Sequence, residues 1–285
     1  MNNGRKIKRI LKSKPTMEGA GVRLKRAFGY NEVPLLDPFL LLDDFHSDNP
    51  NDYIAGFPWH PHRGIETITY MLHGEVRHED SLGNKGVIRP GDVQWMTAGS
   101  GIVHQEMPHQ KKGLLWGFQL WANLPASHKM MDPRYRDVKK DQIPEIILNN
   151  NIKVKVICGE VNGEKGPVQD IVTDPEYLDA TIPPESEFGH YVKKGHTVFA
   201  YVIEGEGYFD QNGSQLISAN NLVIFEDGDE VRISTADNPV RFLLISGKPI
   251  GEPVAWYGPI VMNTRKELEI AFAEYRNGTF IKYKK

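Results

Sequence analysis

The sequence predicts an all-β protein built from two similar domains, with one short helix near its C-terminal end. Short strand-like runs, several of which alternate apolar and polar residues, are separated by turn dipeptides such as Pro90-Gly91 and Asp227-Gly228. Glycine and proline supply 27 and 19 of the 285 residues, a share typical of turn-rich β proteins. Together these features favour a β-sandwich or a β-barrel.

Seven runs have the length and the residue types of strands. They are residues 66–72, 86–96, 114–124, 153–161, 197–205, 221–229 and 240–246. A helix is predicted over residues 264–277, because Thr264 and Glu267 form a capping box and Gly278 supplies a C-terminal stop. Four apolar residues at helical spacing lie between these signals: Leu268, Ala271, Phe272 and Tyr275.

The length and an internal repeat predict two domains. A chain of 285 residues corresponds to about two domains of ordinary size. The segment YMLHGE at 70–75 is similar to YVIEGE at 201–206, which lies 131 residues later. The polar stretch 127–145 contains two prolines and is expected to join the domains, so we divide the chain into residues 1–135 and 136–285.

Composition excludes several classes of protein. The chain carries 34 Lys and Arg against 37 Asp and Glu, so it has no basic excess with which to bind nucleic acid directly. No apolar run approaches the length of about 18 residues that a membrane helix needs, and the basic first residues lack the apolar core of a secretory signal. Cys158 is the single cysteine, which excludes a disulfide within the chain and leads us to expect a reducing, cytoplasmic location.

The candidate chemistry lies in two short motifs, one that joins His60 to His62 and one that joins His104 to Glu106. Residues i and i+2 of a strand point to the same face, so the two members of each motif project together. Two such strands facing each other would bring three imidazoles and one carboxylate to one point. This ligand set suits Fe(II), Mn, Ni, Cu or Zn better than Ca or Mg. The spacing alone leaves a purely structural role for these histidines open.

The stretch that contains both motifs closely resembles the signature of the pirin family, within the cupin superfamily. It reads HPHRGIETITYMLHGEVRHEDSLGNKGVIRPGDVQWMTAGSGIVHQE, residues 60–106. Residues 35–45 (LLDPFLLLDDF) and 251–280 (GEPVAWYGPIVMNTRKELEIAFAEYRNGTF) also resemble pirin segments. The resemblance implies two tandem cupin (jelly-roll) β-barrels in a bicupin arrangement, with one metal, usually iron, in the N-terminal barrel.

The resemblance also implies which residues bind the metal. The pirin ligands fall on four residues of this chain, His60, His62, His104 and Glu106. Fe(II) is the expected metal, with Mn, Ni, Cu or Zn as alternatives. The general cupin pattern has a glutamate shortly after the His-x-His pair, and Glu66 fits it. Because pirins use the later glutamate, Glu66 is expected to be an alternative ligand, or a residue that orients an imidazole or pairs with Arg63.

Residues outside the two motifs have structural interpretations. The repeat offset places five poor ligands at the positions of the second barrel that correspond to the metal site, Tyr191, Lys193, Thr197, Ser234 and Ala236. We therefore expect no metal in the C-terminal barrel, and a structural or surface role for His190 and His196. His78 is interpreted as a surface or loop histidine that could edge the site, and Asp43 and Asp44 are expected to form a turn.

Two functions follow from the resemblance. Some pirins cleave quercetin with O2, so the chain resembles a quercetin 2,3-dioxygenase that opens the central ring of a flavonol, with Glu106 as general base. Such an enzyme needs a small aromatic substrate and O2, and an oxygenase with a different aromatic substrate fits the same site. The alternative is a non-enzymatic, iron-dependent redox sensor that binds regulatory or metabolic protein partners.

Overall fold

A computed structural model describes residues 4–109 and 112–283 of the chain. The chain divides into two compact units, and each is described here by itself. The N-terminal unit consists of Lys14–Lys140 together with the segment that begins at Ile250. The C-terminal unit consists of Asp141–Pro249 together with the segment that ends at Ser13. Both units are formed mostly of β-strands, as the sequence predicted.

The two ends of the chain belong to different units from those that a single cut after residue 135 assigns. Strand β1 (Ile7–Lys12) pairs with β21 (Asn221–Phe225) and so joins the C-terminal unit. The C-terminal helix α1 (Arg265–Arg276) belongs to the N-terminal unit. Long-range strand pairing and packing place these ends, and no local pattern in the sequence reveals either.

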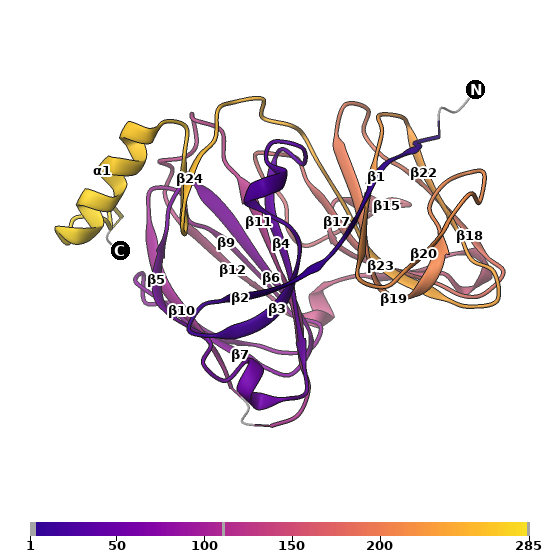
Figure 1. Ribbon diagram of the computed structural model, residues 1–285, viewed down its shortest axis with the longest axis horizontal. Helices are drawn as coiled ribbons and strands as arrows, with labels where there is room; N and C mark the ends of the chain where they lie inside the picture. Colours follow the sequence, from indigo (N-terminus) through magenta and orange to yellow (C-terminus); the bar gives the residue numbers. More distant parts are fainter. Residues whose placement is uncertain (1–3, 110–111, 284–285) are drawn as a thin grey trace. The chain divides into compact units, whose positions relative to one another are not determined.

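The N-terminal unit contains two antiparallel sheets and a small hairpin (Figure 1). Its strands are β2 (Lys14–Glu18), β3 (Val22–Phe28), β4 (Phe39–Ser47), β5 (Phe57–His62), β6 (Ile65–His73), β7 (Val76–Asp80), β8 (Lys85–Ile88), β9 (Val93–Thr97), β10 (Ile102–Pro108), β11 (Leu115–Asn123), β12 (Arg134–Val138), β24 (Ala255–Tyr257) and β25 (Ile260–Met262). The four-stranded sheet has the order β5-β10-β7-β8, and the seven-stranded sheet has the order β12-β9-β6-β11-β4-β3-β2. Strands β24 and β25 form the hairpin, and two 3-10 helices, η1 (Tyr30–Glu32) and η2 (Pro50–Asp52), lie between strands.

The C-terminal unit contains a ten-stranded antiparallel sheet and a short two-stranded one. Besides β1 and β21, its strands are β13 (Glu145–Ile147), β14 (Lys153–Cys158), β15 (Glu160–Val161), β16 (Glu164–Lys165), β17 (Glu176–Ile182), β18 (Glu187–Tyr191), β19 (Thr197–Tyr208), β20 (Leu216–Ser218), β22 (Glu230–Ser234) and β23 (Val240–Gly247). The 3-10 helices η3 (Lys140–Gln142) and η4 (Asn149–Asn151) precede β13 and β14. Alternate residues of its strands, such as Val154, Leu178 and Ala200, form a fully buried aliphatic and aromatic core.

The predicted C-terminal helix is confirmed as α1. Thr264 Oγ1 accepts a hydrogen bond from the Glu267 backbone N–H, and the Glu267 side chain accepts one from the Thr264 N–H, which completes the capping box. Leu268 and Ala271 are buried and pack with residues of the β24–β25 hairpin and with Phe280. The helix therefore buries one face against its own unit and leaves its polar face to solvent.

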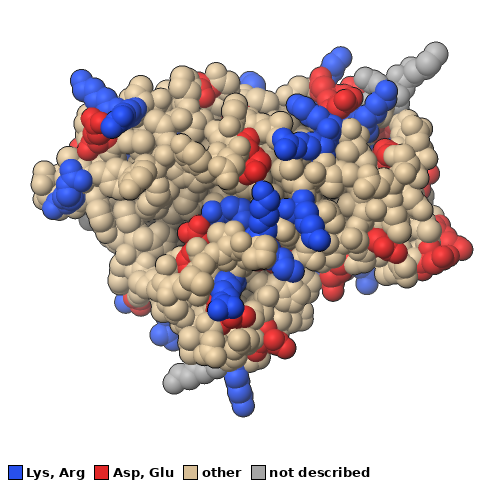
Figure 2. All heavy atoms as spheres, viewed as in Figure 1, with Lys and Arg blue, Asp and Glu red and all other residues tan. Residues whose placement is uncertain are grey.

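Charged side chains of both signs share the face of the molecule seen in Figure 2. Lys and Arg lie among Asp and Glu there, in keeping with the formal net charge of −3. Within residues 4–109 and 112–283, no helix combines the length and the apolar character that crossing a bilayer requires.

Candidate metal centre

Two neighbouring strands of the four-stranded sheet carry the three predicted histidine ligands. Strands β5 and β10 are antiparallel, and His60 lies directly opposite His104 in their register. Directly opposed residues of paired strands point to the same face, and His62 shares it because it lies two residues after His60. Strand periodicity and one long-range pairing therefore direct three imidazoles into the same interior.

The three imidazoles meet through their Nε2 atoms. His60 Nε2 lies 3.0 Å from His62 Nε2 and 2.9 Å from His104 Nε2. Nitrogens that bind one ion at about 2.1 Å, at angles of about 90° to 109°, lie about 3.0 to 3.4 Å apart. In the described part of the chain, these residues are the one group of three or more His, Cys, Asp or Glu whose ligand atoms lie within 4.8 Å of one another.

The outer nitrogen of each imidazole has its own hydrogen-bond partner. The partners are the carbonyl of Pro58 for His60 (2.8 Å), the carbonyl of Pro259 for His62 (3.0 Å) and Nδ1 of His78 for His104 (3.4 Å). A carbonyl can only accept, so His60 and His62 each carry a proton on Nδ1 and a lone pair on Nε2. Lone pairs that face one another at 3 Å repel unless a cation lies between them, and this donor set therefore fits a bound metal ion.

Burial keeps the three imidazoles neutral. It lowers the pKa of His60, and it lowers the pKa values of His62 and His104 well below 6.5. Repulsion from the neighbouring imidazoles adds to the shift of His62 and His104. Neutral imidazole is the form that binds transition metals, so the site is ready to accept an ion near pH 7.

Glu106 lies on the same face of β10 as His104, but residues of the seven-stranded sheet hold its carboxylate. Thr69 Oγ1 donates to Glu106 Oε1 at 2.9 Å, and Gln119 Nε2 donates to Glu106 Oε2 at 3.2 Å. Its charge acts to raise the pKa of His60 against the larger effect of burial. The structure thus brings the three histidines together and places Glu106 nearby, and the role of Glu106 as fourth ligand stays a prediction.

Glu66 does not join the imidazoles. It lies opposite Thr97 in the pairing of β6 with β9, and Thr97 Oγ1 donates a hydrogen bond to Glu66 Oε1 at 2.6 Å. The parity of β5 does not continue into β6, because Gly64 adopts a φ of +77° in the turn between them. Arg63 forms its ion pair with Glu274 at 2.7 Å, so the expected pair between Glu66 and Arg63 is not formed.

A pocket of about 680 Å³ lies against His60 and His62. Its apolar lining includes Leu41, Phe57, Trp121 and Trp256. Its polar lining includes Arg26 and Asp43, which are joined by two hydrogen bonds of 2.8 and 2.7 Å. Burial raises the pKa of Asp43 to about 6. The turn expected at Asp43 and Asp44 is wrong, because β4 continues through both residues to Ser47 and pairs there with β11.

Two family models match most of the chain. The model of pirin matches residues 21–122, and the model of the pirin C-terminal cupin domain matches residues 177–281. The chain belongs to the pirin family. The two matched cupin domains, together with the likeness to solved structures below, confirm the predicted bicupin fold.

Relatives of this pirin are similar over nearly its whole length. A pirin-like protein of Caulobacter vibrioides is 44% identical over 277 residues, which cover 97% of this chain and 99% of that protein. A structure of quercetin 2,3-dioxygenase from Acinetobacter baumannii has a TM-score of 0.90 and 33% identity, covering 97% of this chain and 98% of that one. The nickel(II) complex of a bacterial pirin from Escherichia coli shares the fold, with a TM-score of 0.65 and 21% identity over 85% of this chain and 98% of that one.

Sequence reasoning missed two kinds of residue that support the pirin imidazoles. His78, interpreted as a surface or loop histidine that could edge the site, is fully buried against His104, so the surface interpretation is wrong and the position beside the site is found. The spacing of His78 and Asp80, which repeats the i, i+2 pattern of the two metal motifs, was the signal that could have found it. The carbonyl of Pro259 offers no such signal, because its partner His62 lies 197 residues away and any residue has a carbonyl.

The two histidines near the corresponding positions of the C-terminal unit each lie beside a carboxylate. His190 Nε2 lies 3.0 Å from Glu176 Oε2, and His196 Nε2 lies 3.7 Å from Asp174 Oδ2. Neither histidine belongs to a metal-binding group of the kind that the N-terminal unit contains, within the residues that the structure describes. Their expected structural role stays a prediction.

A buried lysine holds the turn that follows His62 in place by hydrogen bonds. Lys129 is 1% exposed, and its Nζ donates to the carbonyl of Gly64 (2.9 Å), to Asn123 Oδ1 (2.7 Å) and to the carbonyl of Val261 (3.0 Å). All three acceptors are neutral, and burial lowers the pKa of Lys129 to about 7. One side chain therefore links the turn at Gly64 to the β24–β25 hairpin at the cost of burying a cation.

Replacement of Lys129 by methionine is expected to lower the free energy of unfolding by about 3 kcal/mol, because three buried acceptors lose their donor. The folded-state pKa lies below the unfolded value of about 10.4, so the unfolded chain binds more protons between pH 7 and 10. The free energy of unfolding of the wild type therefore rises in that window by up to about 1.4 kcal/mol per pH unit. The difference in this free energy between the wild type and Lys129→Met becomes larger as the pH rises. Urea unfolding at pH 7, 8 and 9 measures this gap, with the exposed Lys85→Met as control. A difference in unfolding free energy that becomes smaller as the pH rises contradicts the lowered pKa of Lys129.

Proposed function

We propose that this pirin is a metal-dependent dioxygenase that opens the central ring of a flavonol such as quercetin with O2. The observation that carries the proposal is the convergence of three neutral imidazole Nε2 atoms beside an aromatic-walled pocket. The likeness to quercetin 2,3-dioxygenase of Acinetobacter baumannii, at 33% identity over nearly the whole chain, supports the choice of substrate. Ring opening inserts both atoms of O2, releases carbon monoxide and leaves a depside ester.

The proposed cofactor is one divalent metal ion held by His60, His62, His104 and Glu106. Fe(II) is our choice, and Mn, Ni, Cu or Zn fit the same nitrogen and oxygen donors. The bacterial pirin of Escherichia coli, which shares the fold, is described in complex with nickel(II), and this supports a metal-binding role. When bound, the ion supplies a Lewis acid that lowers the pKa of the flavonol hydroxyl and a centre at which substrate and O2 meet.

The residues of the pocket orient the substrate in this proposal. Trp121 and Trp256 lie 5.8 Å apart between ring centroids and give a flat flavonol aromatic surfaces to pack against. The Asp43 carboxylate, which lines the same pocket, keeps free lone pairs beyond the two hydrogen bonds from Arg26 and accepts hydrogen bonds from substrate hydroxyls in this proposal. A hydroxylated aromatic compound therefore matches both the apolar walls and the polar residues of the pocket.

Glu106 is the proposed general base. Thr69 and Gln119 hold its two oxygens on the face that carries His104. A carboxylate held in this way can take the proton of the flavonol hydroxyl as the hydroxyl binds, and can return it to the product. Both donors are neutral groups that orient the carboxylate.

Aerobic incubation of the iron-reconstituted protein with quercetin is expected to remove the flavonol absorbance and to release one carbon monoxide per quercetin. Two parallel samples serve as controls, one kept free of O2 and one reconstituted with zinc. Loss of absorbance without carbon monoxide would indicate simple oxidation of the flavonol. An absorbance that stays constant in the iron-loaded, aerated sample rejects the proposed function.

A further inference from the structure

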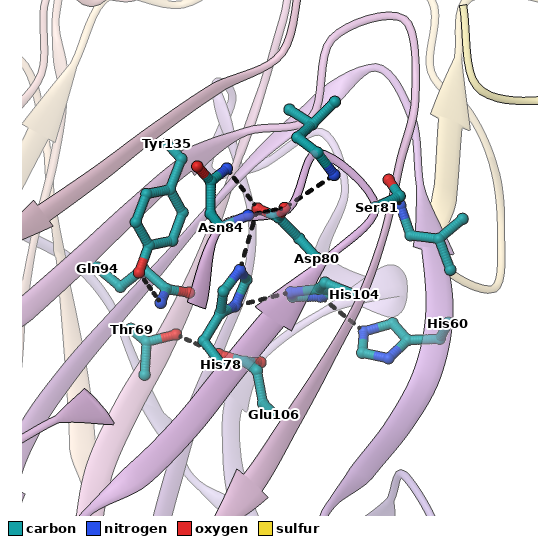
Figure 3. A network of polar contacts seen from close by, with 12 residues as sticks. His60, Thr69, His78, Asp80, Ser81, Asn84, Gln94, His104, Glu106 and Tyr135 are labelled. Atoms are coloured by element: carbon teal, nitrogen blue, oxygen red, sulfur yellow. Dashed lines mark hydrogen bonds and ion pairs between the residues drawn. The ribbon is translucent and has the colours of Figure 1, made fainter. Parts of the chain in front are cut away.

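A fourth histidine, His78, lies next to His104, and Asp80 lies next to His78 (Figure 3). Strand β7 pairs with β10 so that Asp80 lies opposite His104 and His78 lies opposite Glu106. Directly opposed residues share a face, so all four side chains point into the same interior. His78 and His104 are 0% exposed, and the Asp80 side chain is 0% exposed as well.

The hydrogen bonds around Asp80 determine which atoms donate and which accept along the series Asp80, His78 and His104. Asp80 accepts from the Leu82 N–H (2.9 Å), from the Asn84 N–H (3.0 Å) and from Asn84 Nδ2 (2.8 Å). His78 Nε2 lies 3.2 Å from the same carboxylate. Three N–H groups already point at Asp80, which identifies it as a carboxylate that accepts throughout, so His78 carries its proton on Nε2.

The remaining nitrogen of His78 then determines the state of His104. The Nδ1 atoms of His78 and His104 lie 3.4 Å apart, so one of them donates and the other accepts. Because His78 already donates from Nε2 to Asp80, its Nδ1 is the acceptor. His104 therefore donates from Nδ1 and keeps its Nε2 lone pair for the group of three imidazoles. His60 and His62 reach the same state by donating to neutral backbone carbonyls, whereas His104 alone is connected to an anion.

We propose that Asp80 and His78 form a positioning relay that fixes the orientation and tautomer of His104 and makes it the strongest electron donor of the three imidazoles. A negative charge that is transmitted through two hydrogen-bonded rings increases the basicity of the ligand nitrogen. A more basic ligand stabilises the higher oxidation state of a redox metal. The inference rests on the metal site of the proposed function, and it does not depend on the flavonol chemistry.

The relay predicts separate effects on metal affinity and on redox potential. His78→Phe removes the acceptor of His104 and is expected to weaken Ni(II) binding about 10- to 100-fold, measured by competition with a chelator. The same variant is expected to raise the Fe(III)/Fe(II) midpoint potential of the iron-reconstituted protein. His78→Asn places an amide oxygen near the position of Nδ1, so it is expected to recover most of the affinity while the potential stays raised.

Asp80→Asn provides a second test that does not change the histidine. The amide oxygen still accepts from the backbone N–H groups of Leu82 and Asn84, but the NH2 group that replaces Oδ2 cannot accept from His78. The negative charge and the hydrogen bond to His78 are both lost, so the potential is expected to rise as it does in the His78 variants. Tyr135→Phe is the matched control, because the Tyr135 ring lies 5.0 Å from the His78 ring and its hydroxyl contacts Gln94 rather than the relay. We expect this control to bind Ni(II) within about twofold of wild type.

The outcomes separate the relay from the proposed function. A wild-type potential in folded His78→Asn and Asp80→Asn proteins, or a wild-type Ni(II) affinity in folded His78→Phe, overturns the relay, because a role in folding alone changes neither quantity. A wild-type protein that binds neither Ni(II) nor iron contradicts the metal site itself, and with it the relay. Shifted potentials in a protein that does not cleave quercetin support the relay and reject only the flavonol chemistry.

Discussion

His104→Ala is expected to reduce the bound metal from about one ion per chain to a small fraction, and to abolish quercetin cleavage. His104 is fully buried, its Nε2 lies 2.9 Å from that of His60, and the removed ring is the one connected to Asp80. Loss of a residue that only supports a ligand costs up to about 100-fold in metal affinity, and loss of the ligand itself should exceed that. Metal analysis after purification without added metal measures the effect.

A cavity left by the missing ring could also destabilise the protein, so the comparison needs a second readout. Excess Ni(II) should raise the melting temperature of the wild type, because a ligand that binds only the folded state stabilises it, and should leave that of His104→Ala unchanged. His109→Ala is the control, since this exposed histidine pairs with Glu75. Equal metal content in wild type and His104→Ala would remove the basis for the metal centre.

Glu106→Gln is expected to lower kcat for quercetin cleavage by about 10²- to 10⁴-fold, the range that general bases supply. The variant should keep most of its metal, because three imidazoles remain and three protein ligands suffice at many catalytic sites. An amide fits the same place, since its oxygen can accept from Gln119 and the Thr69 hydroxyl can turn to accept from its NH2 group. The ratio of activity to bound metal is therefore the quantity to measure.

The two roles assigned to Glu106 give different results in this experiment. Metal retained with activity lost indicates a base, whereas metal and activity lost in proportion indicate that Glu106 acts mainly as a ligand. Glu79→Gln is the control, because Glu79 lies on β7 and its carboxylate accepts from Gln105. Full activity in metal-loaded Glu106→Gln would exclude the proposed base.

Local signals in the sequence predicted most of what depends on one strand or one helix. The capping box at Thr264 and Glu267 is present, and the i, i+2 spacing of His60 and His62 does place both rings on one face. The convergence with His104 came from the resemblance to pirins as much as from the spacing, because the pairing of β5 with β10 brings together segments more than forty residues apart.

The failures concern contacts that depend on turns and on register between distant strands. Glu66 has the right parity only if the strand is continuous, and the turn at Gly64 breaks it. The burial of His78 depends on the pairing of β7 with β10, and no local pattern in the sequence predicts that pairing. The two compact units differ at both ends from a single cut after residue 135, because β1 pairs with the distant strand β21 and α1 belongs to the N-terminal unit.

The hydrogen bond between His62 and the carbonyl of Pro259 has a consequence for the order of events during synthesis. His62 leaves the ribosome early, but the acceptor that directs its proton is translated almost two hundred codons later. A nascent chain that has completed β5 and β10 still has one imidazole free to rotate. The hydrogen bond that fixes the tautomer of His62 therefore cannot form until residue 259 has been synthesised and the β24–β25 hairpin has folded.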